Sequence, residues 1–333
     1  MARHLVTGGA GYVGSHLVLA LLDAGEEVVV LDDFSTGHRA AVPAGAVLVE
    51  ADLADRRAVE EVFAAWRFDA VFHLAALSLV GESMREPLRY IRSNVHNALT
   101  LAEVALRAGV LRFVFSSTAA IFGMPEEVPI PETAPERPVN PYGESKLMVE
   151  RALRWAASAH GLRPAFLRYF NAAGADPQGR AGEDHSPETH LIPRAIQAVL
   201  GVAEPLTVFG TDYDTPDGTA VRDYVHVTDL AAAHLAVLPK LESGPVAYNI
   251  GNGNGHSVRT VIRTIERVTG RPVPHVLGPR RPGDPPVLVA SSERLQAETG
   301  WRPRYGALEE IVRTAWNWHT AHPLGYAGQA AAA

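Results

Sequence analysis

The chain has 333 residues, a formal net charge of −7 and a hydrophobic fraction of 47%. This length and apolar content suffice for one large or two modest domains, while the acidic balance argues against a nucleic-acid partner. The absence of cysteine excludes disulfides, thiolate chemistry and cysteine-ligated metal. We find no apolar run of membrane-spanning length and no room for a signal peptide before the first predicted strand. We therefore expect a cytoplasmic protein with no membrane partner.

The first 32 residues contain a strand, a glycine-rich turn, a helix and a second strand that ends in an acid. Residues 4–7 form the first apolar run, and the turn Gly-Gly-Ala-Gly-Tyr-Val-Gly follows at 8–14. Apolar residues at helical spacing then predict a helix up to Gly25, and residues 28–31 predict the next strand. This context distinguishes a dinucleotide fingerprint from a plain glycine-rich loop.

The glycines and the acid have distinct roles in such a fingerprint. Gly8 allows the tight turn, Gly11 lets the backbone approach a pyrophosphate, and Gly14 lets the helix pack on the strand. The helix N-terminus supplies N–H groups to the phosphates. Asp32 is expected to bind the adenosine ribose hydroxyls and to repel a 2′-phosphate, so the sequence favours NAD over NADP.

Only two of the 30 basic residues are lysines, and one of them, Lys146, lies four residues after Tyr142. Helical spacing places the ammonium and the phenol on one face of the predicted helix 142–158. A nearby positive charge lowers the pKa of a tyrosine from its usual value of about 10, which suits proton transfer near neutral pH. An ordinary surface pair has the same spacing, so this interpretation needs support from other residues.

A third candidate group follows the predicted strand 112–116. Thr118 is the best candidate for a hydroxyl that faces Tyr142, and Ser117 is the second. Routine capping of a strand end by Ser or Thr is the alternative interpretation.

Predicted strands and helices alternate through the first half of the chain, which favours an α/β fold with a doubly wound parallel (Rossmann) sheet. The further strands are predicted at 46–50, 70–74, 112–116 and 165–169, and the further helices at 55–66, 87–108 and 142–158. Ligands are expected at the carboxyl ends of the strands. The predicted domains are an NAD-binding domain at 1–171 with a returning segment near 221–239, a smaller α/β substrate-binding domain at 172–325, and a flexible tail at 326–333.

The glycine turn, Thr118, Tyr142 and Lys146 together resemble the extended short-chain dehydrogenase/reductase superfamily. The motifs at 167–171, 209–213, 221–227 and 280–284 are similar to those of the UDP-glucose 4-epimerase family, in order, from residue 3 to about 322. The resemblance implies an isomerase that interconverts UDP-galactose and UDP-glucose through a 4-keto sugar. Tyr142 would remove the 4-hydroxyl proton, Lys146 would hold the nicotinamide ribose, and Thr118 would bind the 4-oxygen.

The resemblance also implies the ligand-binding residues. The residues expected to bind NAD are Gly8, Gly11, Tyr12, Val13, Gly14, Asp32, Asp33, Asp52, Leu53, Leu74, Ala75, Ala76, Ser78, Asn94, Ser116, Tyr142, Lys146, Tyr169 and Phe170. Those expected to bind the UDP-sugar are Thr118, Asn171, His190, Leu191, Val208, Phe209, Arg222, Arg281, Asp284 and Leu288. Taken alone, Arg222 and Arg281 would be read as surface ion-pair residues; the family motif assigns them to the diphosphate.

Two further expectations concern metals and assembly. The histidines lack metal-ligand spacing, so we predict no metal. A homodimer is expected by resemblance, and the helix at 142–158 offers Leu147, Val149, Leu153 and Trp155 for helix pairing, unless that face packs internally.

The substrate and the reaction class leave alternatives open. Leu288 falls where a bulky aromatic residue is associated with excluding N-acetylated sugars, so we hypothesise partial acceptance of UDP-N-acetylglucosamine. UDP-arabinose and UDP-xylose are alternative substrates. A sugar-nucleotide dehydratase would need carboxylates directly after Thr118, where Ala119 and Ala120 stand. A non-catalytic NAD sensor on the same fold would typically lack the tyrosine or the lysine.

Overall fold

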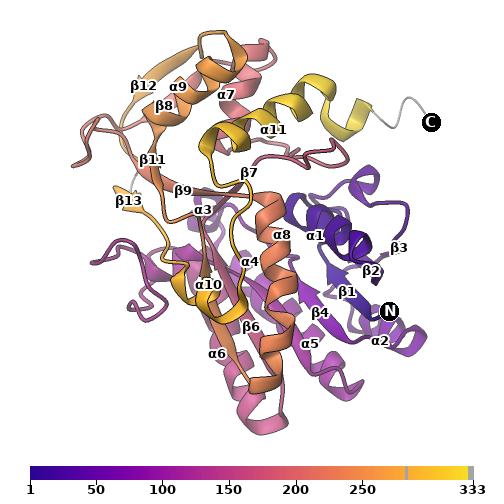
Figure 1. Cartoon of the computed structure of the whole chain (residues 1–333). Coiled ribbons are helices and arrows are strands. Elements are labelled where there is room, and N and C mark those ends of the chain that lie inside the picture. Colours follow the sequence, from indigo (N-terminus) through magenta and orange to yellow (C-terminus); the bar gives the residue numbers. More distant parts are fainter. Residues whose placement is uncertain (282–283, 329–333) are drawn as a thin grey trace.

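The structure is a computed structural model that describes residues 1–281 and 284–328. Its larger part is built on a parallel sheet of seven strands in the order β10-β6-β5-β4-β1-β2-β3 (Figure 1). The strands are β1 (Arg3–Thr7), β2 (Glu27–Asp32), β3 (Val47–Glu50), β4 (Ala70–His73), β5 (Arg112–Thr118), β6 (Arg163–Tyr169) and β10 (Val246–Ile250). Near-continuous runs of Val, Leu and Phe explain a sheet that is buried on both faces.

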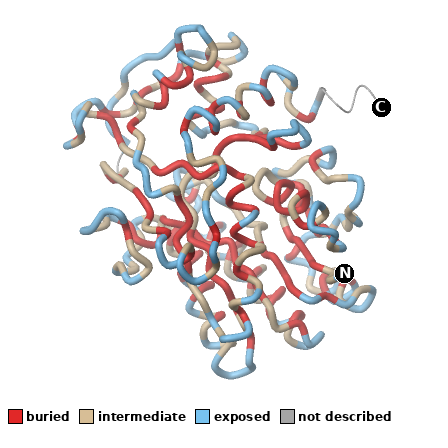
Figure 2. Tube along the Cα trace, viewed as in Figure 1, coloured by how far each residue is buried: buried red, intermediate tan, exposed pale blue. Residues whose placement is uncertain are grey.

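Helices cover both faces of this sheet, as expected for a doubly wound fold. Helices α1 (Tyr12–Asp23) and α8 (Val227–Ala236) pack on one face, where Leu17, Leu21 and Leu230 belong to one buried cluster. Helices α2 (Arg56–Ala65), α5 (Asn97–Arg107) and α6 (Pro141–His160) pack on the other, around a second cluster that contains Leu101 and Leu153. The buried (red) backbone in Figure 2 follows the strands between the two layers of helices. The predicted α/β class is confirmed.

Helix α6 has clear start and stop signals in its sequence. The Asn140 side chain caps it by accepting a 2.8 Å hydrogen bond from the backbone N–H of Gly143, and Pro141 occupies its first turn. Gly161 ends the helix in a left-handed conformation with φ of 74°. These signals fix the start of α6 just before Tyr142, which places this residue in the first turn.

The returning segment is longer than the sequence analysis predicts. Within the predicted return at 221–239, α8 packs on the sheet, but β9 (Val221–His226) lies outside the seven-stranded sheet. The strand that joins this sheet is β10, which pairs in parallel with β6. The chain therefore does not divide into two contiguous parts at 171–172. It returns to the sheet once more with β10, which lies after the predicted return at 221–239.

The predicted helix at 87–108 is interrupted. It consists of α4 (Pro87–Ile91), a π-helical turn (Arg92–His96) and α5, and it is preceded by the short helix α3 (Val80–Arg85), which the sequence analysis missed. The wider turn contains Asn94, which is buried. Such π-turns are frequent at functional sites.

The smaller part lies above the sheet in Figure 1 and has a core of its own, with Ile196, Ile265 and Ile311 among its buried residues. Its helices are α7 (Leu191–Leu200), α9 (Val258–Thr269) and α11 (Leu308–Ala321); α10 (Glu293–Thr299) packs beside β10. Its strands are β7 (Asn171–Ala173), β8 (Leu206–Phe209), β9, β11 (Gly255–Ser257), β12 (His275–Gly278) and β13 (Val287–Leu288). Short 3-10 helices are found at Arg39–Ala41, Ala119–Phe122, Leu238–Ser243 and Gly325–Gly328.

The start of the predicted flexible tail is packed. Tyr326 is buried, donates a hydrogen bond to the carbonyl oxygen of Gly182, and contacts the ring of Trp318. The expected tail at 326–333 is therefore wrong at its beginning, because Tyr326 fills an apolar site under α11. Residues 329–333 lie outside the described residues.

Candidate active site

The glycine turn forms a tight cradle between β1 and α1. Gly8 has a φ of +73°, and a Cβ atom there would lie 2.5 Å from the backbone nitrogen of Ala75. A Cβ atom at Gly14 would lie 2.0 Å from the carbonyl oxygen of Gly8. Packing within the chain therefore requires both glycines, as in a turn that brings a helix close to a strand.

Gly11 is different, because packing within the chain does not explain it. A Cβ atom at this position would meet only the carbonyl oxygen of Gly8, at 3.3 Å, among the described residues. The turn leads directly into the N-terminus of α1, whose first N–H groups have no partner within the helix and can bind an anion. The cradle therefore fits a dinucleotide pyrophosphate.

Asp32 lies at the end of β2 and is buried next to this cradle. Its carboxylate accepts hydrogen bonds of 2.9 Å from the backbone N–H groups of Ala10 and Phe34. Burial raises the pKa of Asp32, although these two N–H groups lower it. Asp32 thus ties β2 to the glycine turn and keeps lone pairs available for ribose hydroxyls.

The other residues predicted to bind the adenosine half lie around this edge of the sheet. Asp33 and Asp52 are exposed and accept hydrogen bonds from the backbone N–H groups of Ser35 and Ala54, and Leu53 is buried. Tyr12 begins α1, and its hydroxyl donates a 2.7 Å hydrogen bond to the carbonyl oxygen of Gly174. Val13 packs against the sheet core.

The loop after β4 crosses the carboxyl edge of the sheet. Leu74 and Ala75 donate backbone hydrogen bonds to the carbonyl oxygen of Thr7, and Ala76 follows them, half-buried. Asn94 binds the backbone N–H and carbonyl oxygen of Leu77 and donates to the Ser145 hydroxyl at 3.0 Å. The Asn94 amide therefore fastens this loop to α6. Ser78 is exposed.

Tyr142, Lys146 and Thr118 are brought together where β5 ends and α6 begins. The Thr118 side chain lies close enough to the Tyr142 phenol to lower its pKa, and its hydroxyl accepts a 3.1 Å hydrogen bond from the backbone N–H of Ala120. Lys146 is buried one helical turn along α6, where its ammonium donates a 2.8 Å hydrogen bond to the carbonyl oxygen of Ser116 and lies 4.8 Å from the centre of the Phe115 ring. The remaining donors of the ammonium are available to a ligand.

The neighbouring hydroxyls are held by other groups. Ser117 is fully buried and donates a 2.5 Å hydrogen bond to Glu150. The Ser116 hydroxyl is hydrogen-bonded to the phenol of Tyr169. The structure therefore favours Thr118 over Ser117 as the hydroxyl that faces Tyr142.

The pKa of Tyr142 differs from the sequence-based prediction. Burial raises it, while the neighbouring Thr118 side chain lowers it, and the net shift is upward. The prediction that Lys146 lowers this pKa in the protein alone is therefore wrong, because desolvation of the phenolate dominates. Burial also lowers the pKa of Lys146 to about 7.

The residues predicted to bind the nucleotide diphosphate lie together in the smaller part. Arg222 on β9 forms an ion pair with Asp284 and donates a 2.7 Å hydrogen bond to the carbonyl oxygen of Val221. The guanidinium of Arg281 lies 4.2 Å from the centre of the Phe209 ring. A cavity of about 770 Å³ is lined by Arg281, Asp284 and Tyr213. Residues 282–283 of the motif at 280–284 lie outside the described residues.

The other residues predicted to bind the substrate differ in how deeply they are buried. Val208 is buried in the core of the smaller part, so its side chain is structural. Leu288 on β13 pairs with Arg222 and packs with Phe170 on the buried cluster around Ile121. Asn171 and Leu191 are half-buried at the starts of β7 and α7.

A separate hollow of about 210 Å³, between Arg3 and Trp66, lies at the opposite edge of the sheet from the catalytic trio.

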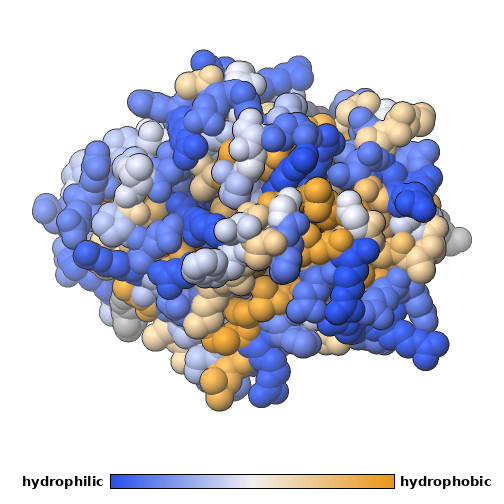
Figure 3. Space-filling view, turned by 90° about the horizontal axis from the view of Figure 1, so that it is seen from below, coloured by the Kyte–Doolittle hydropathy of each residue, from blue (hydrophilic) through white to orange (hydrophobic). Residues whose placement is uncertain are grey.

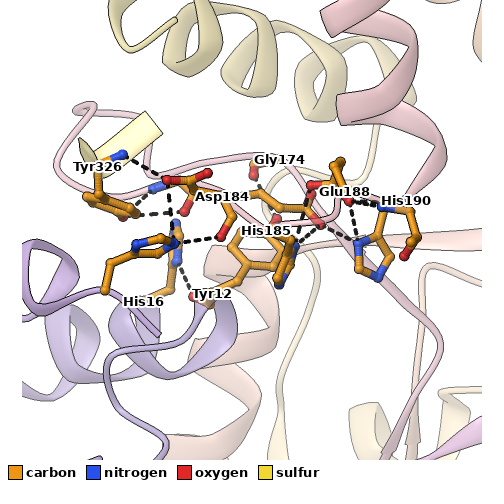
Figure 4. Close-up of polar contacts among 12 residues, drawn as sticks. Tyr12, His16, Gly174, Asp184, His185, Glu188, His190 and Tyr326 are labelled. Atoms are coloured by element: carbon orange, nitrogen blue, oxygen red, sulfur yellow. Dashed lines mark hydrogen bonds and ion pairs between the residues drawn. The ribbon is translucent and has the colours of Figure 1, made fainter. Parts of the chain in front are cut away.

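Four residues of the segment 183–190 form a cluster that the sequence analysis missed. Glu183, His185, Glu188 and His190 each present a ligand atom, and these atoms lie within 4.8 Å of one another. Figure 4 shows His185, Glu188 and His190 pointing toward one another beside Tyr12. The local signal was the alternation of acids and histidines within eight residues, which has neither helical nor zinc-finger spacing.

Comparison with known proteins agrees with this site. The model of the family described as NAD dependent epimerase/dehydratase matches residues 4–251. The UDP-glucose 4-epimerase of Azospirillum brasilense is 52% identical, over 98% of this chain and 95% of that protein. The crystal structure of UDP-glucose 4-epimerase from Brucella ovis in complex with NAD has a TM-score of 0.92 at 44% identity and covers 95% of this chain and 98% of its own.

A third relative is described as holding both a dinucleotide and a nucleotide. The UDP-glucose 4-epimerase from Bifidobacterium longum in complex with NAD+ and UDP has a TM-score of 0.93 at 36% identity and covers 97% of this chain and 99% of its own. The resemblance inferred from the sequence is thus confirmed over nearly the whole length of the chain. The chain belongs to the NAD dependent epimerase/dehydratase family.

Proposed function

We propose that the chain is a UDP-sugar 4-epimerase that interconverts UDP-galactose and UDP-glucose and keeps its NAD between turnovers. The observation that carries the proposal is the trio of Thr118, Tyr142 and Lys146 at the carboxyl end of β5, on the sheet edge where the glycine cradle also lies. Relatives that are UDP-glucose 4-epimerases, one of them in complex with NAD+ and UDP, support the same reaction.

The residues have complementary roles in this reaction. Bound NAD supplies reversible hydride acceptance from carbon 4 of the sugar. The Tyr142 phenolate oxygen takes the proton of the sugar 4-hydroxyl and later returns it, while the Thr118 hydroxyl holds the sugar 4-oxygen. Lys146 places a buried cation one helical turn from the phenol, which favours phenolate against the desolvation that opposes it.

The binding residues divide between the two parts of the fold. Gly11 and the N-terminus of α1 hold the pyrophosphate of NAD, and Asp32 holds its adenosine ribose. Arg222 and Arg281 hold the diphosphate of the UDP-sugar, where the ion pair between Arg222 and Asp284 would open or be shared. This division places the sugar between the catalytic trio and the smaller part.

One residue, Leu288, suggests that the chain also accepts UDP-N-acetylhexosamines as substrates. Leu288 is half-buried on β13 and lies next to Arg222 across the β13–β9 pair. A leucine occupies less space than an aromatic residue, so we propose that UDP-N-acetylhexosamines are also converted. Activity on UDP-glucose with none on the N-acetyl sugar at saturation would refute this.

The deciding experiment uses purified protein with no added cofactor. UDP-galactose, UDP-N-acetylgalactosamine and UDP-arabinose are incubated separately, and the products are resolved by chromatography. We expect the 4-epimer of UDP-galactose from the wild type and none from Tyr142→Phe with NAD still bound. No epimer from any of the three by a folded, NAD-containing wild type would reject the proposal and favour a dehydratase or an NAD sensor.

We propose a homodimer that pairs through α6, although fewer side chains of this helix are available for pairing than the sequence suggested. Leu147, Val149 and Leu153 are fully buried within the chain, whereas Trp155 and Met148 are 77% and 38% exposed. Figure 3 shows apolar (orange) side chains gathered in a band across the lower face of the molecule. Light scattering should give a dimer mass for the wild type and a monomer mass for Trp155→Glu. A monomeric wild type would reject the dimer.

The cellular location is proposed from the sequence alone. Within the described residues, no helix is both long enough and apolar enough to span the membrane. We propose a cytoplasmic location, where UDP-sugars are available. Fractionation of cells that express the chain at natural levels would test it.

A further inference from the structure

We propose that Glu183, His185, Glu188 and His190 form a structural binding site for a divalent transition metal ion of the zinc type. This site is separate from the catalytic trio, and the proposal does not depend on which sugar nucleotide the chain converts. It replaces the sequence-based expectation of no metal, which rested only on the spacing of the histidines.

The distances within the cluster suit a tetrahedral ion. His190 Nδ1 lies 2.9 Å from an oxygen of Glu183 and 2.9 Å from an oxygen of Glu188. His185 Nδ1 lies 3.4 Å from an oxygen of each glutamate. Zinc–nitrogen and zinc–oxygen bonds of about 2.0–2.2 Å give ligand–ligand distances of about 3.4 Å in a tetrahedron. A slight lengthening of the two 2.9 Å contacts would make room for the ion.

The hydrogen bonding within the cluster is incomplete. Glu183 is only 4% exposed, and its Oε1 atom, although 2.9 Å from His190 Nδ1 and 3.4 Å from His185 Nδ1, accepts no aligned hydrogen bond from the described residues. The same holds, within the described part of the chain, for Nδ1 of His185 and Oε2 of Glu188. His185 Nδ1 is thus close to two carboxylates without being aligned to either. Buried carboxylate oxygens without aligned donors are costly, and a shared cation would satisfy them together because it needs no aligned N–H group.

The competing interpretation is a cluster of ion pairs between two glutamates and two histidinium rings. Burial lowers the pKa of both histidines, but the two carboxylates outweigh it and raise the pKa of His185 to about 9 and of His190 to about 10. In that state two protons neutralise the two carboxylates. A divalent ion would supply the same charge from one central position, with both histidines neutral.

The chemistry of the four ligands selects the metal. Two imidazoles and two carboxylates favour zinc and related transition ions, whereas magnesium prefers an octahedral shell of oxygens. Four protein ligands fill a tetrahedral shell, which is typical of a structural rather than a catalytic ion.

The position of the cluster suggests what the ion stabilises. The His185 ring packs edge-on against Tyr12, the first residue of α1 after the glycine cradle, with ring centres 6.1 Å apart. His190 directly precedes α7, and it is a predicted substrate residue. An ion bound through His190 Nδ1 would fix the ring and leave Nε2 for the nucleotide. The ion would therefore join the cofactor cradle to the nucleotide-binding part.

The test measures metal binding directly, on protein without an affinity tag, since histidine tags bind zinc. NAD-containing protein is dialysed against a chelator and then against ZnCl₂ or MgCl₂, and bound metal is counted by mass spectrometry. We expect about one zinc ion per chain and no magnesium, with a higher melting temperature only in zinc. Cobalt(II) should give the intense visible absorption of a tetrahedral site.

Variants separate this site from other histidines. His185→Gln and Glu183→Gln should each reduce zinc binding at least tenfold. His38→Gln should not, although His38 contacts Asp184 of the same segment at 3.0 Å through a hydrogen bond to its backbone carbonyl oxygen. Each variant is checked for folding by circular dichroism and for retained NAD.

Three outcomes would overturn the proposal. They are a wild type that binds no more zinc than His185→Gln, zinc binding that survives in both cluster variants, and a weak octahedral cobalt spectrum. The first of these would assign the cluster to ion pairs alone. If the variants fail to fold, the cobalt spectrum of the wild type decides.

Discussion

The ammonium of Lys146 donates a 2.8 Å hydrogen bond to the backbone carbonyl oxygen of Ser116, and so joins α6 to the end of β5. This contact fixes the cation beside the strand that carries Thr118. The site therefore holds a buried charge with few protein partners before any ligand arrives, and the protein alone bears the cost of burying it.

The first prediction concerns the stability of NAD-free protein with Lys146→Met. Burial lowers the pKa of Lys146 from 10.5 to about 7, so between these values the unfolded chain binds more protons than the folded chain. Wild-type stability should therefore rise with pH across this window relative to the variant. Below pH 7 the variant should be the more stable by roughly 2–5 kcal/mol. Urea unfolding at several pH values measures this, and a difference that does not vary with pH would contradict it.

The second prediction contrasts two glycines of the cradle. Gly11→Ala should fold normally but bind NAD at least about tenfold more weakly, because the added methyl group lies within reach of the Gly8 carbonyl only and occupies space meant for the ligand. Gly14→Ala should instead lower stability, since its Cβ atom would overlap the Gly8 carbonyl oxygen. Retained NAD and the melting temperature of the NAD-free forms distinguish the two. Full NAD retention by a folded Gly11→Ala protein would count against the cradle.

The third prediction concerns a buried ion pair behind the catalytic helix. Arg168 on β6 donates hydrogen bonds of 3.0 and 2.7 Å to Glu150 on α6, and both side chains are essentially inaccessible to solvent. Glu150→Gln should destabilise the protein by about 3–5 kcal/mol, because it leaves Arg168 without its full counter-charge. It should also lower kcat, since Glu150 anchors the helix that carries Tyr142.

The matched control for this pair is Glu61→Gln. Glu61 forms a 3.0 Å ion pair with Arg57 at an exposed i,i+4 position on α2, so its loss should change stability by less than about 0.5 kcal/mol. Equal costs for the two substitutions, measured by urea unfolding, would show that burial of the Arg168–Glu150 pair has no special importance.

The fourth prediction tests substrate choice at Leu288. Leu288→Tyr should lower the ratio of kcat/KM for UDP-N-acetylgalactosamine to that for UDP-galactose at least about tenfold, because the larger ring removes space beside Arg222. Leu277→Tyr, at an exposed position on β12, should leave the ratio unchanged. An unchanged ratio in Leu288→Tyr would place the acetyl group elsewhere.

The features that the sequence predicted well are local. The glycine turn lies within seven consecutive residues, and Tyr142 and Lys146 are separated by one helical turn, so helix geometry alone relates them. The alternation of strands and helices likewise predicts the parallel sheet, because each strand is a short apolar run. Family resemblance then extends these local patterns to NAD and to the reaction.

The sequence could not predict which side chains are buried or which residues that are distant in the chain make contact. The upward shift of the Tyr142 pKa comes from burial of the phenol in the folded chain, which the local spacing of Tyr142 and Lys146 does not reveal. The pairing of Arg222 with Asp284 spans 62 positions, and β10 joins β6 across a whole crossover.

The segment 183–190 combines residues that are close in sequence with a site that forms only in the folded chain. Its acids and histidines are close in sequence, but their alternation has no regular period that predicts convergence. Only the packing of this loop against Tyr12 and α7 turns four side chains toward one point. Local geometry thus follows from residue order because backbone dihedrals relate near neighbours, whereas a shared site needs the packed chain to bring its groups together and remove their water.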